Sequence, residues 1–419
     1  MNELYDIEEA PERVLLVGVA TDNTEAVAIS LAELKELAET AGAVTVGTLI
    51  QNREQIHPGT YLGKGKLDEL RELITELNAT GIICDDELSP AQLRNLQETL
   101  ETKIMDRTLI ILDIFAQHAS TRDGKIQVEL AQLKYRSARL TGLGASLSRL
   151  GGGIGTRGPG EKKLEIDRRL IKDRISHLND ELSAIRQSRE TARKQRMQNH
   201  MPVAAIVGYT NAGKSTLLNT LTAAGVLEED KLFATLDPTT RILALPSGQE
   251  VLLTDTVGFI RKLPHHLIDA FRSTLEEAKY ADIIIHVVDS SNPCMDAHMD
   301  TVYETLRQLG VEDKPVITLF NKQDLVEGRP ILRDFNAAKT VSVSAKHGSG
   351  LPLLLDSLEE LLRARTLFLQ KTFPYHEAGK IAAIRKYGQL LTEEYREDGI
   401  YVEAYVPYSI IGQYGMQNQ

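Results

Sequence analysis

A glycine-rich segment in the middle of the chain has the residue types and spacing that hold nucleotide phosphates. Gly208 is followed, after four residues, by Gly213, Lys214 and Ser215, which is the P-loop pattern. Glycines let backbone N–H groups point at phosphate oxygens, the lysine reaches the β- and γ-phosphates, and the serine hydroxyl is a ligand for Mg²⁺. An apolar run ends at Val207 and a helix-forming run follows Ser215, as this pattern requires. We expect contacts to the phosphates from Gly208, Tyr209, Thr210, Asn211, Ala212, Gly213, Lys214, Ser215 and Thr216, with Lys214 as a catalytic residue and Ser215 as a metal ligand.

A second short pattern, Asp-x-x-Gly, follows the apolar run that ends near Leu253. An aspartate at this place faces Mg²⁺, usually through a water molecule, and the N–H of the glycine bonds the γ-phosphate. The expected residues are Asp255, Thr256, Val257 and Gly258.

A third pattern selects the base. The carboxylate of Asp324 offers two acceptors that match the N1–H and the exocyclic amine of guanine, whereas adenine presents no such pair of donors. Asn321 and Lys322 brace the loop around it, and Gln323 is a further residue expected to contact the nucleotide. The segment Ser344, Ala345 and Lys346 follows an apolar run and brings the amide of Ala345 to the guanine O6. The order of these patterns predicts a Mg²⁺-dependent GTPase.

The segment between the P-loop and Asp255 carries three threonines, Thr235, Thr239 and Thr240. One threonine in this place closes over Mg²⁺ and the γ-phosphate and releases after hydrolysis. Composition does not choose among the three.

The residue after Gly258 bears on the rate of hydrolysis. Many small GTPases have a glutamine there, which orients the attacking water. In this chain the residue is Phe259, and an aromatic ring cannot position water by hydrogen bonding. We therefore expect slow intrinsic hydrolysis that a partner accelerates.

The elements that position these residues follow from hydrophobic patterns. Buried-strand runs alternate with helical runs between residues 13 and 107 and again between residues 202 and 364, which predicts two α/β domains with mostly parallel sheets. After residue 365 we expect a small α+β appendage, with strands at Ile381–Ile384 and Ile400–Val406 around a helix at Gly388–Arg396. The predicted domains are a small N-terminal α/β domain at residues 1–118, a basic helical hairpin at 119–199, a P-loop domain at 200–366 and the appendage at 367–419.

The predicted hairpin carries a local excess of positive charge. Residues 121–200 contain 18 Lys and Arg against 9 Asp and Glu, although the formal net charge of the chain is −11. Two helical seams flank Gly151–Gly160, which is too rich in Gly and Pro to be helical. A solvated helix face with ion pairs such as Glu165–Arg169 is one interpretation, and we favour RNA binding instead. The cations on or beside the loop are Arg136, Arg139, Arg149, Arg157, Lys162, Lys163, Arg168 and Arg169.

Composition excludes several classes of protein. Among the 419 residues no apolar run is long enough to span a bilayer, and the acidic N-terminus lacks the features of a signal peptide. The two cysteines, Cys84 and Cys294, lie in unlike segments, so we expect reduced thiols and a cytoplasmic protein. We expect a monomer, and peripheral association with a membrane stays open.

Together these patterns resemble the HflX family of bacterial GTPases of the translation-factor class. The resemblance also covers Tyr61–Lys66, Asp106–Ala119 and Gly158–Glu161, and so nearly the whole chain, most weakly after residue 365. It implies binding to the large (50S) ribosomal subunit and its rRNA, with ribosome binding or subunit splitting and rescue coupled to the state of bound GTP or GDP. It also implies that Thr235 is the Mg²⁺-binding, catalytic threonine. The segment that contacts nucleotide would then be Phe233, Ala234, Thr235, Leu236 and Asp237, with Thr239 and Thr240 as structural switch residues.

The resemblance leaves two further points open. GTPases of this kind with an asparagine at the position of Asn211 use a K⁺ ion near the phosphates, and the alternative is that Asn211 only shapes the loop. HflX-like proteins have been credited with ATP use through the N-terminal region, where Lys64 and Lys66 are candidate anion ligands, although no second P-loop is present. The competing functions are therefore an ATP- or GTP-using RNA remodeller and a GTP switch acting on a protein or membrane partner.

Overall fold

The computed structural model describes residues 11–147, 159–198, 201–222, 232–233, 239–262, 277–311, 313–328, 331–364, 366–407 and 410–412. The chain divides into two compact units, which comprise residues 1–183 with 262–270 and residues 184–261 with 271–419. Within these described ranges, no helix is long and apolar enough to cross a membrane.

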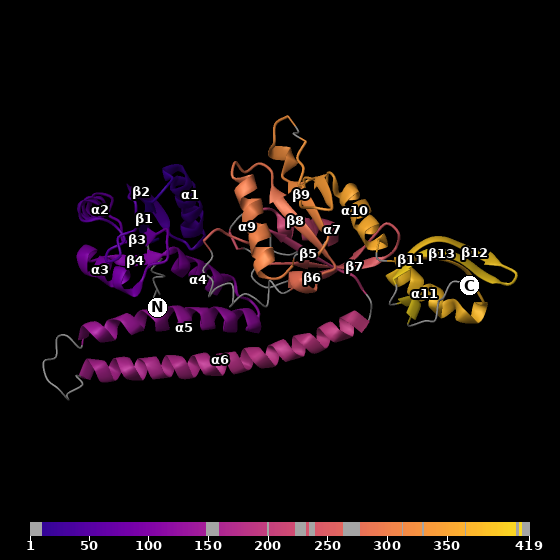
Figure 1. Cartoon of the computed structure of the whole chain (residues 1–419), viewed down its shortest axis with the longest axis horizontal. Helices are drawn as coiled ribbons and strands as arrows, with labels where there is room; N and C mark the ends of the chain where they lie inside the picture. The colour runs from indigo at the N-terminus through magenta and orange to yellow at the C-terminus, as the bar shows by residue number, and fades with distance from the viewer. Residues whose placement is uncertain are drawn as a thin grey trace, which may run out of the picture. The chain divides into compact units, whose positions relative to one another are not determined.

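The first unit contains a four-stranded parallel sheet in the order β2-β1-β3-β4 (Figure 1). Every residue of β1 after Arg13 is buried, as the apolar run in the sequence predicts. The fourth strand, β4, has only two apolar residues between Lys103 and Asp106, so its sequence does not show the apolar run that marks the other buried strands. The strands are β1 (Arg13–Ala20), β2 (Val44–Asn52), β3 (Gly81–Cys84) and β4 (Lys103–Asp106). The crossover helices are α1 (Thr24–Thr40), α2 (Lys64–Glu76), α3 (Pro90–Leu100) and α4 (Arg107–His118).

Buried charges tie α4 to the carboxyl edge of this sheet. Asp106 is fully buried and caps α4 by accepting from the N–H of Leu109 at 2.9 Å. The same carboxylate accepts from the Tyr135 hydroxyl at 2.8 Å and from Arg139 at 2.7 Å. Arg107, also buried, donates to Asp85 at 2.8 Å. This network gives the Asp106–Ala119 stretch a structural role.

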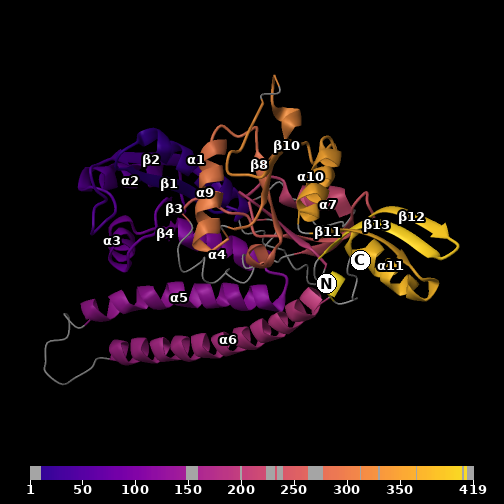
Figure 2. The same cartoon turned by 45° about the vertical axis from the view of Figure 1, so that its right-hand side comes forward.

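Two long helices, α5 (Arg122–Leu147) and α6 (Pro159–Gln198), form the predicted hairpin (Figures 1 and 2). Arg122 pairs with Glu181 at 3.0 Å and Arg174 pairs with Glu129 at 2.7 Å, so the helices run antiparallel. Pro159 and Gly160 begin α6, which corrects the expectation that the whole of Gly151–Gly160 is non-helical. Proline is tolerated in the first turn because its missing N–H has no partner there in any case. Residues 151–158 lie outside the described residues.

The second unit is built on a six-stranded sheet in the order β10-β9-β8-β5-β7-β6. All neighbouring strands are parallel except β6, which pairs antiparallel with β7. The edge strand β6 has one buried residue in five, which is why an apolar pattern did not reveal it. The strands are β5 (Val203–Gly208), β6 (Thr240–Ala244), β7 (Glu250–Asp255), β8 (Ile283–Asp289), β9 (Val316–Asn321) and β10 (Lys339–Ser342). The helices include α7 (Lys214–Thr222), α9 (Met295–Gln308) and α10 (Leu351–Arg363).

The C-terminal part of this unit corrects two predicted elements. Ile381–Ile384 lies in a helix, α11 (Ala378–Tyr387), and the predicted helix at Gly388–Arg396 is instead strand β12 (Gln389–Arg396). The buried Ile381 and Ile384 are one helical turn apart and pack in a common core, a spacing that also fits a short apolar strand run. The predicted strand Ile400–Val406 is confirmed within β13 (Gly399–Pro407). It pairs antiparallel with β12 and with β11 (Thr366–Phe373).

Candidate nucleotide-binding site

The P-loop connects β5 to α7, and its glycines sit where no side chain fits. A Cβ atom on Gly208 would lie 2.3 Å from the carbonyl oxygen of Val287 in β8. Gly213 has φ +94°, and a Cβ atom there would lie 2.3 Å from Nδ2 of Asn321. The two glycines therefore let the loop close over the carboxyl ends of β8 and β9, and the same contact joins the P-loop to the base-binding loop.

Asn211 adopts a left-handed conformation, with φ +59°. Asparagine tolerates this region better than most residues. Its side chain is exposed at the loop surface. This backbone agrees with a loop-shaping role, and it does not test whether the residue also binds K⁺.

Lys214 is buried at the start of α7, and its Nζ donates to the carbonyl of Tyr209 at 2.8 Å. Burial lowers the pKa of the Lys214 ammonium from 10.5 to about 8, and the nearby carboxylate of Asp255 acts in the opposite direction. A buried ammonium that lacks a full counter-charge is suited to receive phosphate oxygens.

Ser215 and Asp255 form an oxygen pair beside the P-loop. The Ser215 hydroxyl donates to Oδ2 of Asp255 at 3.0 Å, and Asp255 is fully buried at the end of β7. Hard oxygen donors of this kind suit Mg²⁺, which keeps several waters and needs few protein ligands. Among the described residues, no group of three or more His, Cys, Asp or Glu side chains is arranged to hold a metal on its own. The residues present therefore fit a Mg²⁺ ion held jointly with phosphates.

Gly258 lies against the P-loop. A Cβ atom there would be 2.9 Å from Lys214 Nζ and 2.8 Å from Cγ2 of Thr210, so only glycine fits. The next residue, Phe259, is buried, its N–H donates to the Gly208 carbonyl at 3.1 Å, and its carbonyl accepts from the Thr210 N–H at 2.8 Å. The phenyl ring is thus part of the core and cannot orient water.

Asn321, at the end of β9, joins two of the predicted nucleotide-binding loops by hydrogen bonds. Its amide donates to the Ala212 carbonyl at 2.8 Å and accepts from the Ala345 N–H at 2.9 Å. Lys322 pairs with Asp289 at 2.8 Å. Asn321 therefore links the P-loop directly to the Ser344–Lys346 segment.

Asp324 is accessible and stays ionised. The Ser344 hydroxyl donates to its Oδ1 at 2.6 Å, and this hydrogen bond holds the pKa of the carboxyl below its usual value. Of the neighbouring predicted residues, Ala345 is buried, and Gln323 donates to the Ser290 hydroxyl at 2.8 Å. The structure thus brings the residues of the P-loop, Asp-x-x-Gly and base-binding patterns to one edge of the sheet.

Sequence reasoning missed three supporting residues. Asp289 and Ser290, at the end of β8, hold Lys322 and Gln323. Thr220 in α7 donates to the Ala345 carbonyl at 2.9 Å. The position of Asp289 and Ser290 directly after a buried strand was a usable signal, whereas nothing local marks Thr220.

Part of the predicted switch segment lies outside the described residues, namely Ala234, Thr235, Leu236 and Asp237. Phe233 is buried. The Thr239 carbonyl accepts from the Asp255 N–H at 2.9 Å, and the Thr240 and Thr254 hydroxyls lie 3.0 Å apart across β6 and β7. Thr239 and Thr240 therefore hold the strand that leads to Asp255, and the role of Thr235 stays a prediction.

The predicted cations of the hairpin divide into two kinds. Arg139 stacks on Tyr135 and pairs with Asp106, and Arg168 donates to the Leu140 carbonyl at 2.7 Å, so both support the helices. The side chain of Arg169 is 84% exposed, and it pairs along α6 with Asp173, which is also exposed, at 3.8 Å. Arg149 and Arg157 lie outside the described residues, as do the side chains of Lys162 and Lys163.

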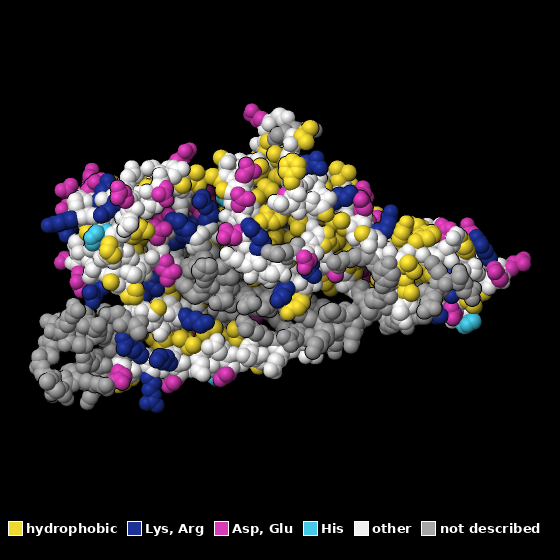
Figure 3. Space-filling view, in the orientation of Figure 1, with side chains coloured by type: hydrophobic (Ala, Val, Ile, Leu, Met, Phe, Trp, Pro, Cys, Tyr) yellow, Lys and Arg dark blue, Asp and Glu magenta, His cyan; other side chains and the backbone are white. Residues whose placement is uncertain are grey.

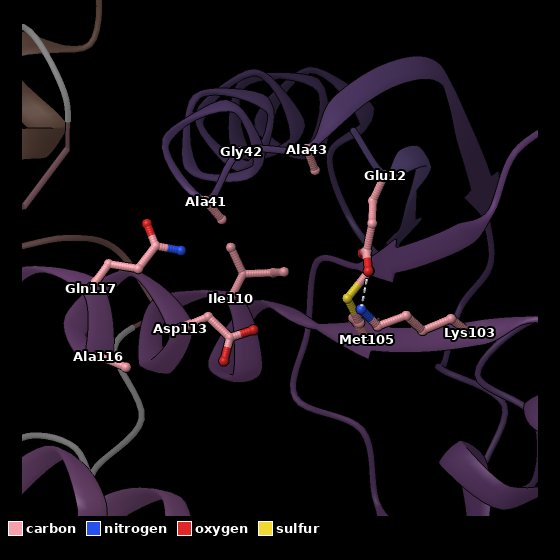
Figure 4. A pocket seen from close by; sticks show the side chains of 10 residues that line it. All are labelled: Glu12, Ala41, Gly42, Ala43, Lys103, Met105, Ile110, Asp113, Ala116 and Gln117. Carbon is pink, nitrogen blue, oxygen red and sulfur yellow. Dashed lines mark hydrogen bonds and ion pairs between the residues drawn. The ribbon is translucent and has the colours of Figure 1, made fainter. Parts of the chain in front are cut away.

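A cavity of about 330 Å³ in the first unit lies at the amino ends of β1 and β4 (Figure 4). Its acidic side chains are Glu12, which pairs with Lys103 at 2.5 Å, and Asp113, whose pKa burial raises. Lys103 is the one cation among the lining residues and is already paired with Glu12, so the cavity is poorly suited to a polyphosphate. Lys64 and Lys66 lie at the start of α2 and do not line the cavity, and Lys66 pairs with Glu69 at 2.8 Å. These observations do not favour the predicted ATP site in the N-terminal region.

The fold and site define a P-loop GTPase, and comparisons with known proteins agree. Residues 203–322 match the family described as "50S ribosome-binding GTPase", residues 28–116 match "GTP-binding GTPase N-terminal", and residues 118–196 match "GTP-binding GTPase Middle Region". The chain is 67% identical to the GTPase HflX of Lacrimispora saccharolytica, over 97% of this chain and 96% of that one. It is 40% identical to the GTPase HflX of Escherichia coli K12, over 86% and 85% of the two chains. The chain therefore belongs to the HflX family of GTPases, as the sequence predicted, and is a GTP-hydrolysing enzyme.

Solved structures give a weaker likeness. A GTP-binding protein from Sulfolobus solfataricus in complex with GDP is 25% identical, with a TM-score of 0.44, over 83% of this chain and 98% of that one.

Proposed function

We propose that this GTPase is a switch that binds the large (50S) ribosomal subunit and couples its nucleotide state to ribosome binding or to the splitting and rescue of ribosomes. The observation that carries this proposal is the match of residues 203–322 to a family of 50S ribosome-binding GTPases. The division into residues 1–118, 119–199, 200–366 and 367–419 belongs to the proposal, with the hairpin of 119–199 as the arm that contacts rRNA. We place the protein in the cytoplasm, where ribosomes are.

The hairpin supports the proposal through its charge. Residues 121–200 have twice as many Lys and Arg as Asp and Glu in a chain whose net charge is −11. Arg169 and Lys172 are exposed on α6, and Figure 3 shows Lys and Arg side chains along the described part of the hairpin. Cations in such positions neutralise RNA phosphates, whereas Arg139 and Arg168 are engaged within the protein.

In the proposed site Asp324 holds the guanine and the P-loop amides hold the phosphates. Lys214 donates to the β- and γ-phosphates, and the Gly258 N–H donates to the γ-phosphate. Water attacks the γ-phosphorus, the bond to the β–γ bridging oxygen breaks, and GDP and phosphate leave. Ser215, Asp255 and the predicted Thr235 would hold Mg²⁺ together with the phosphates, and the ion would supply positive charge against the charge that develops on them.

Two features point to assisted hydrolysis. Phe259 supplies no group that orients water, so we infer that ribosome binding completes the site. Asn211 is a candidate ligand for K⁺, whose charge would add to that of Lys214. Replacing K⁺ by Na⁺ should then lower the hydrolysis rate, and an unchanged rate would remove K⁺ from the mechanism.

Cosedimentation with 50S subunits tests the proposal. We expect binding with a non-hydrolysable GTP analogue to exceed binding with GDP, and to weaken by roughly tenfold or more between 50 and 200 mM salt. The double variant R169A/K172A should bind more weakly with a shallower salt dependence. K35A, which removes an exposed lysine of α1 that pairs with Glu39, is the matched control. If binding to 50S subunits depends neither on the bound nucleotide nor on salt, the proposal of an RNA-contacting switch is contradicted and a protein or membrane partner is favoured.

A further inference from the structure

The side chain of Tyr209, the second residue of the P-loop, is held by a ring stack and by a hydrogen bond. Its ring is buried and stacks on His298 of α9, with ring centroids 3.7 Å apart and an interplanar angle of 5°. Burial and the nearby Arg261 lower the pKa of His298 to about 4, so the imidazole is neutral at ordinary pH. The stack is therefore a contact between two neutral rings and does not depend on charge.

The phenol of Tyr209 reaches the segment that follows Gly258. Its oxygen accepts a hydrogen bond from the Arg261 N–H at 2.8 Å. Two backbone hydrogen bonds join Phe259 to the P-loop on either side of Tyr209, at Gly208 and Thr210. Three hydrogen bonds thus fasten residues 259–261 to residues 208–210, and the phenol is the one made by a side chain.

We propose that Tyr209 is a positioning residue for GTP hydrolysis. It holds the Gly258–Arg261 segment in the position from which the Gly258 N–H can donate to the γ-phosphate. His298 acts behind it by fixing the ring. The proposal rests on the role proposed for Gly258 at the γ-phosphate.

The chemistry of this chain makes such a residue necessary. Since Phe259 is buried, the segment offers the γ-phosphate backbone groups and no glutamine side chain. A backbone donor contributes only when its position is held to a fraction of an ångström. Asn321 and Asp324 hold the guanine end of the site independently of Tyr209, so loss of the phenol should affect GTP more than GDP.

The test compares Y209F with Y303F in the full-length chain. Y209F keeps the stacked ring and removes the acceptor of the Arg261 N–H. Y303F removes a phenol hydrogen bond of 2.5 Å to Asp334 in the same unit, but it does not touch residues 258–261. The readouts are the unfolding temperature, the affinities for GDP and for a non-hydrolysable GTP analogue, and the single-turnover hydrolysis rate.

For Y209F we expect hydrolysis about tenfold slower and binding of the GTP analogue several-fold weaker, with GDP affinity within about twofold of the parent. Y303F should leave all three nucleotide readouts within about twofold at a comparable loss of stability. H298L, which removes the stack, should lower hydrolysis in the same direction. Combining it with Y209F should cost less than the sum of the two changes, because both act through one contact.

Equal nucleotide readouts for Y209F and Y303F would overturn the proposal, as would equal losses of GDP and GTP-analogue affinity in Y209F. The variant G258A distinguishes a wrong role for Tyr209 from a wrong role for Gly258. If G258A abolishes hydrolysis and Y209F hydrolyses GTP at the parent rate, Gly258 acts without Tyr209. If G258A also hydrolyses GTP at the parent rate, the role proposed for Gly258 is itself wrong.

Discussion

At the guanine end of the site, Asp324 and Asn321 have different roles. The exposed carboxylate of Asp324 is available to recognise the base, and the buried amide of Asn321 supports the loops around it. Asp324 is held ionised by the Ser344 hydroxyl and faces solvent, where a base can reach it. Asn321 is buried, and its side-chain amide is hydrogen-bonded to the backbone of Ala212 and Ala345. Substitution of Asp324 should therefore change which base binds, whereas substitution of Asn321 should loosen the whole loop.

D324N tests recognition of the base at the scale of one residue. An amide keeps one acceptor but replaces the other by a donor, which opposes the exocyclic amine of guanine and matches the carbonyl of xanthine. We expect GTP affinity to fall by roughly 100-fold or more, because a hydrogen bond to a charged group is lost and a mismatched donor is added. Affinity for xanthosine triphosphate should rise.

Competition binding with the two triphosphates measures this change. D313N, which neutralises an exposed acid in the same unit, should leave both affinities unchanged. Undiminished GTP binding by D324N would show that guanine is recognised elsewhere.

Lys214 gives a pH dependence whose sign follows from its lowered pKa. Without nucleotide the pKa is about 8 instead of 10.5, so between these values the folded protein holds fewer protons than the unfolded chain. The cost of burying the ammonium is therefore present below pH 8 and disappears as pH rises. Bound phosphates raise the pKa again, so GTP binding near pH 8 should take up about half a proton at this group.

Titration calorimetry in buffers of different ionisation enthalpy measures this uptake. It should be small at pH 6.5 and grow toward pH 8, and GTP affinity should decline above that pH. A proton balance of zero at pH 8 would show that Lys214 is fully protonated before GTP arrives.

At the scale of elements, helices and strands with a strong sequence pattern could be predicted, and those with a weak pattern could not. The strand–loop–helix around Gly208–Ser215 was predictable, because a buried parallel strand, glycines and a helix start coincide within twenty residues. The start of α3 also has a local signal, since Ser89 is a capping residue that is followed by a proline in the first turn. The short strand β4 and the exposed edge strand β6 have too few buried apolar residues to be recognised as strands from the sequence.

The assignments in residues 381–396 failed for a different reason. A short run of Ile and Ala fits either a strand or one face of a helix, and the polar stretch after Gly388 becomes a strand only because β13 pairs with it. Thr220 could not be found from spacing, because it meets Ala345 only after the sheet has formed, whereas the position of Asp289 at the end of a buried strand was a signal that could have been used.

Asp106 provides a prediction for an element of the first unit. D106N should lower the free energy of unfolding by about 3 kcal/mol, because Arg139 loses its buried partner and four donors share a weaker acceptor. Denaturant unfolding followed by circular dichroism measures the loss.

D113N is the control on the same helix. Burial raises the pKa of Asp113, so removing its charge should be neutral or slightly stabilising. Equal stability of the two variants would show that the Asp106 network contributes nothing beyond packing.

At the scale of the whole molecule, charge and chemistry are separated along the sequence. The nucleotide residues run from Gly208 to Lys346, while the positive excess lies in residues 121–200 of an otherwise acidic chain. We assign guanine-nucleotide binding to the residues of this site, and the buried Phe259, at the position where many GTPases have a glutamine, offers no group that orients water. We therefore propose that fast hydrolysis requires a partner that the basic hairpin recognises.

Single-turnover GTP hydrolysis with and without 50S subunits tests whether a partner supplies fast hydrolysis. We expect a slow rate for the protein alone and a rate at least tenfold higher with saturating subunits, with the increase reduced in R169A/K172A and retained in K35A. Equal rates with and without subunits, under conditions where cosedimentation shows that the two are bound, would contradict it.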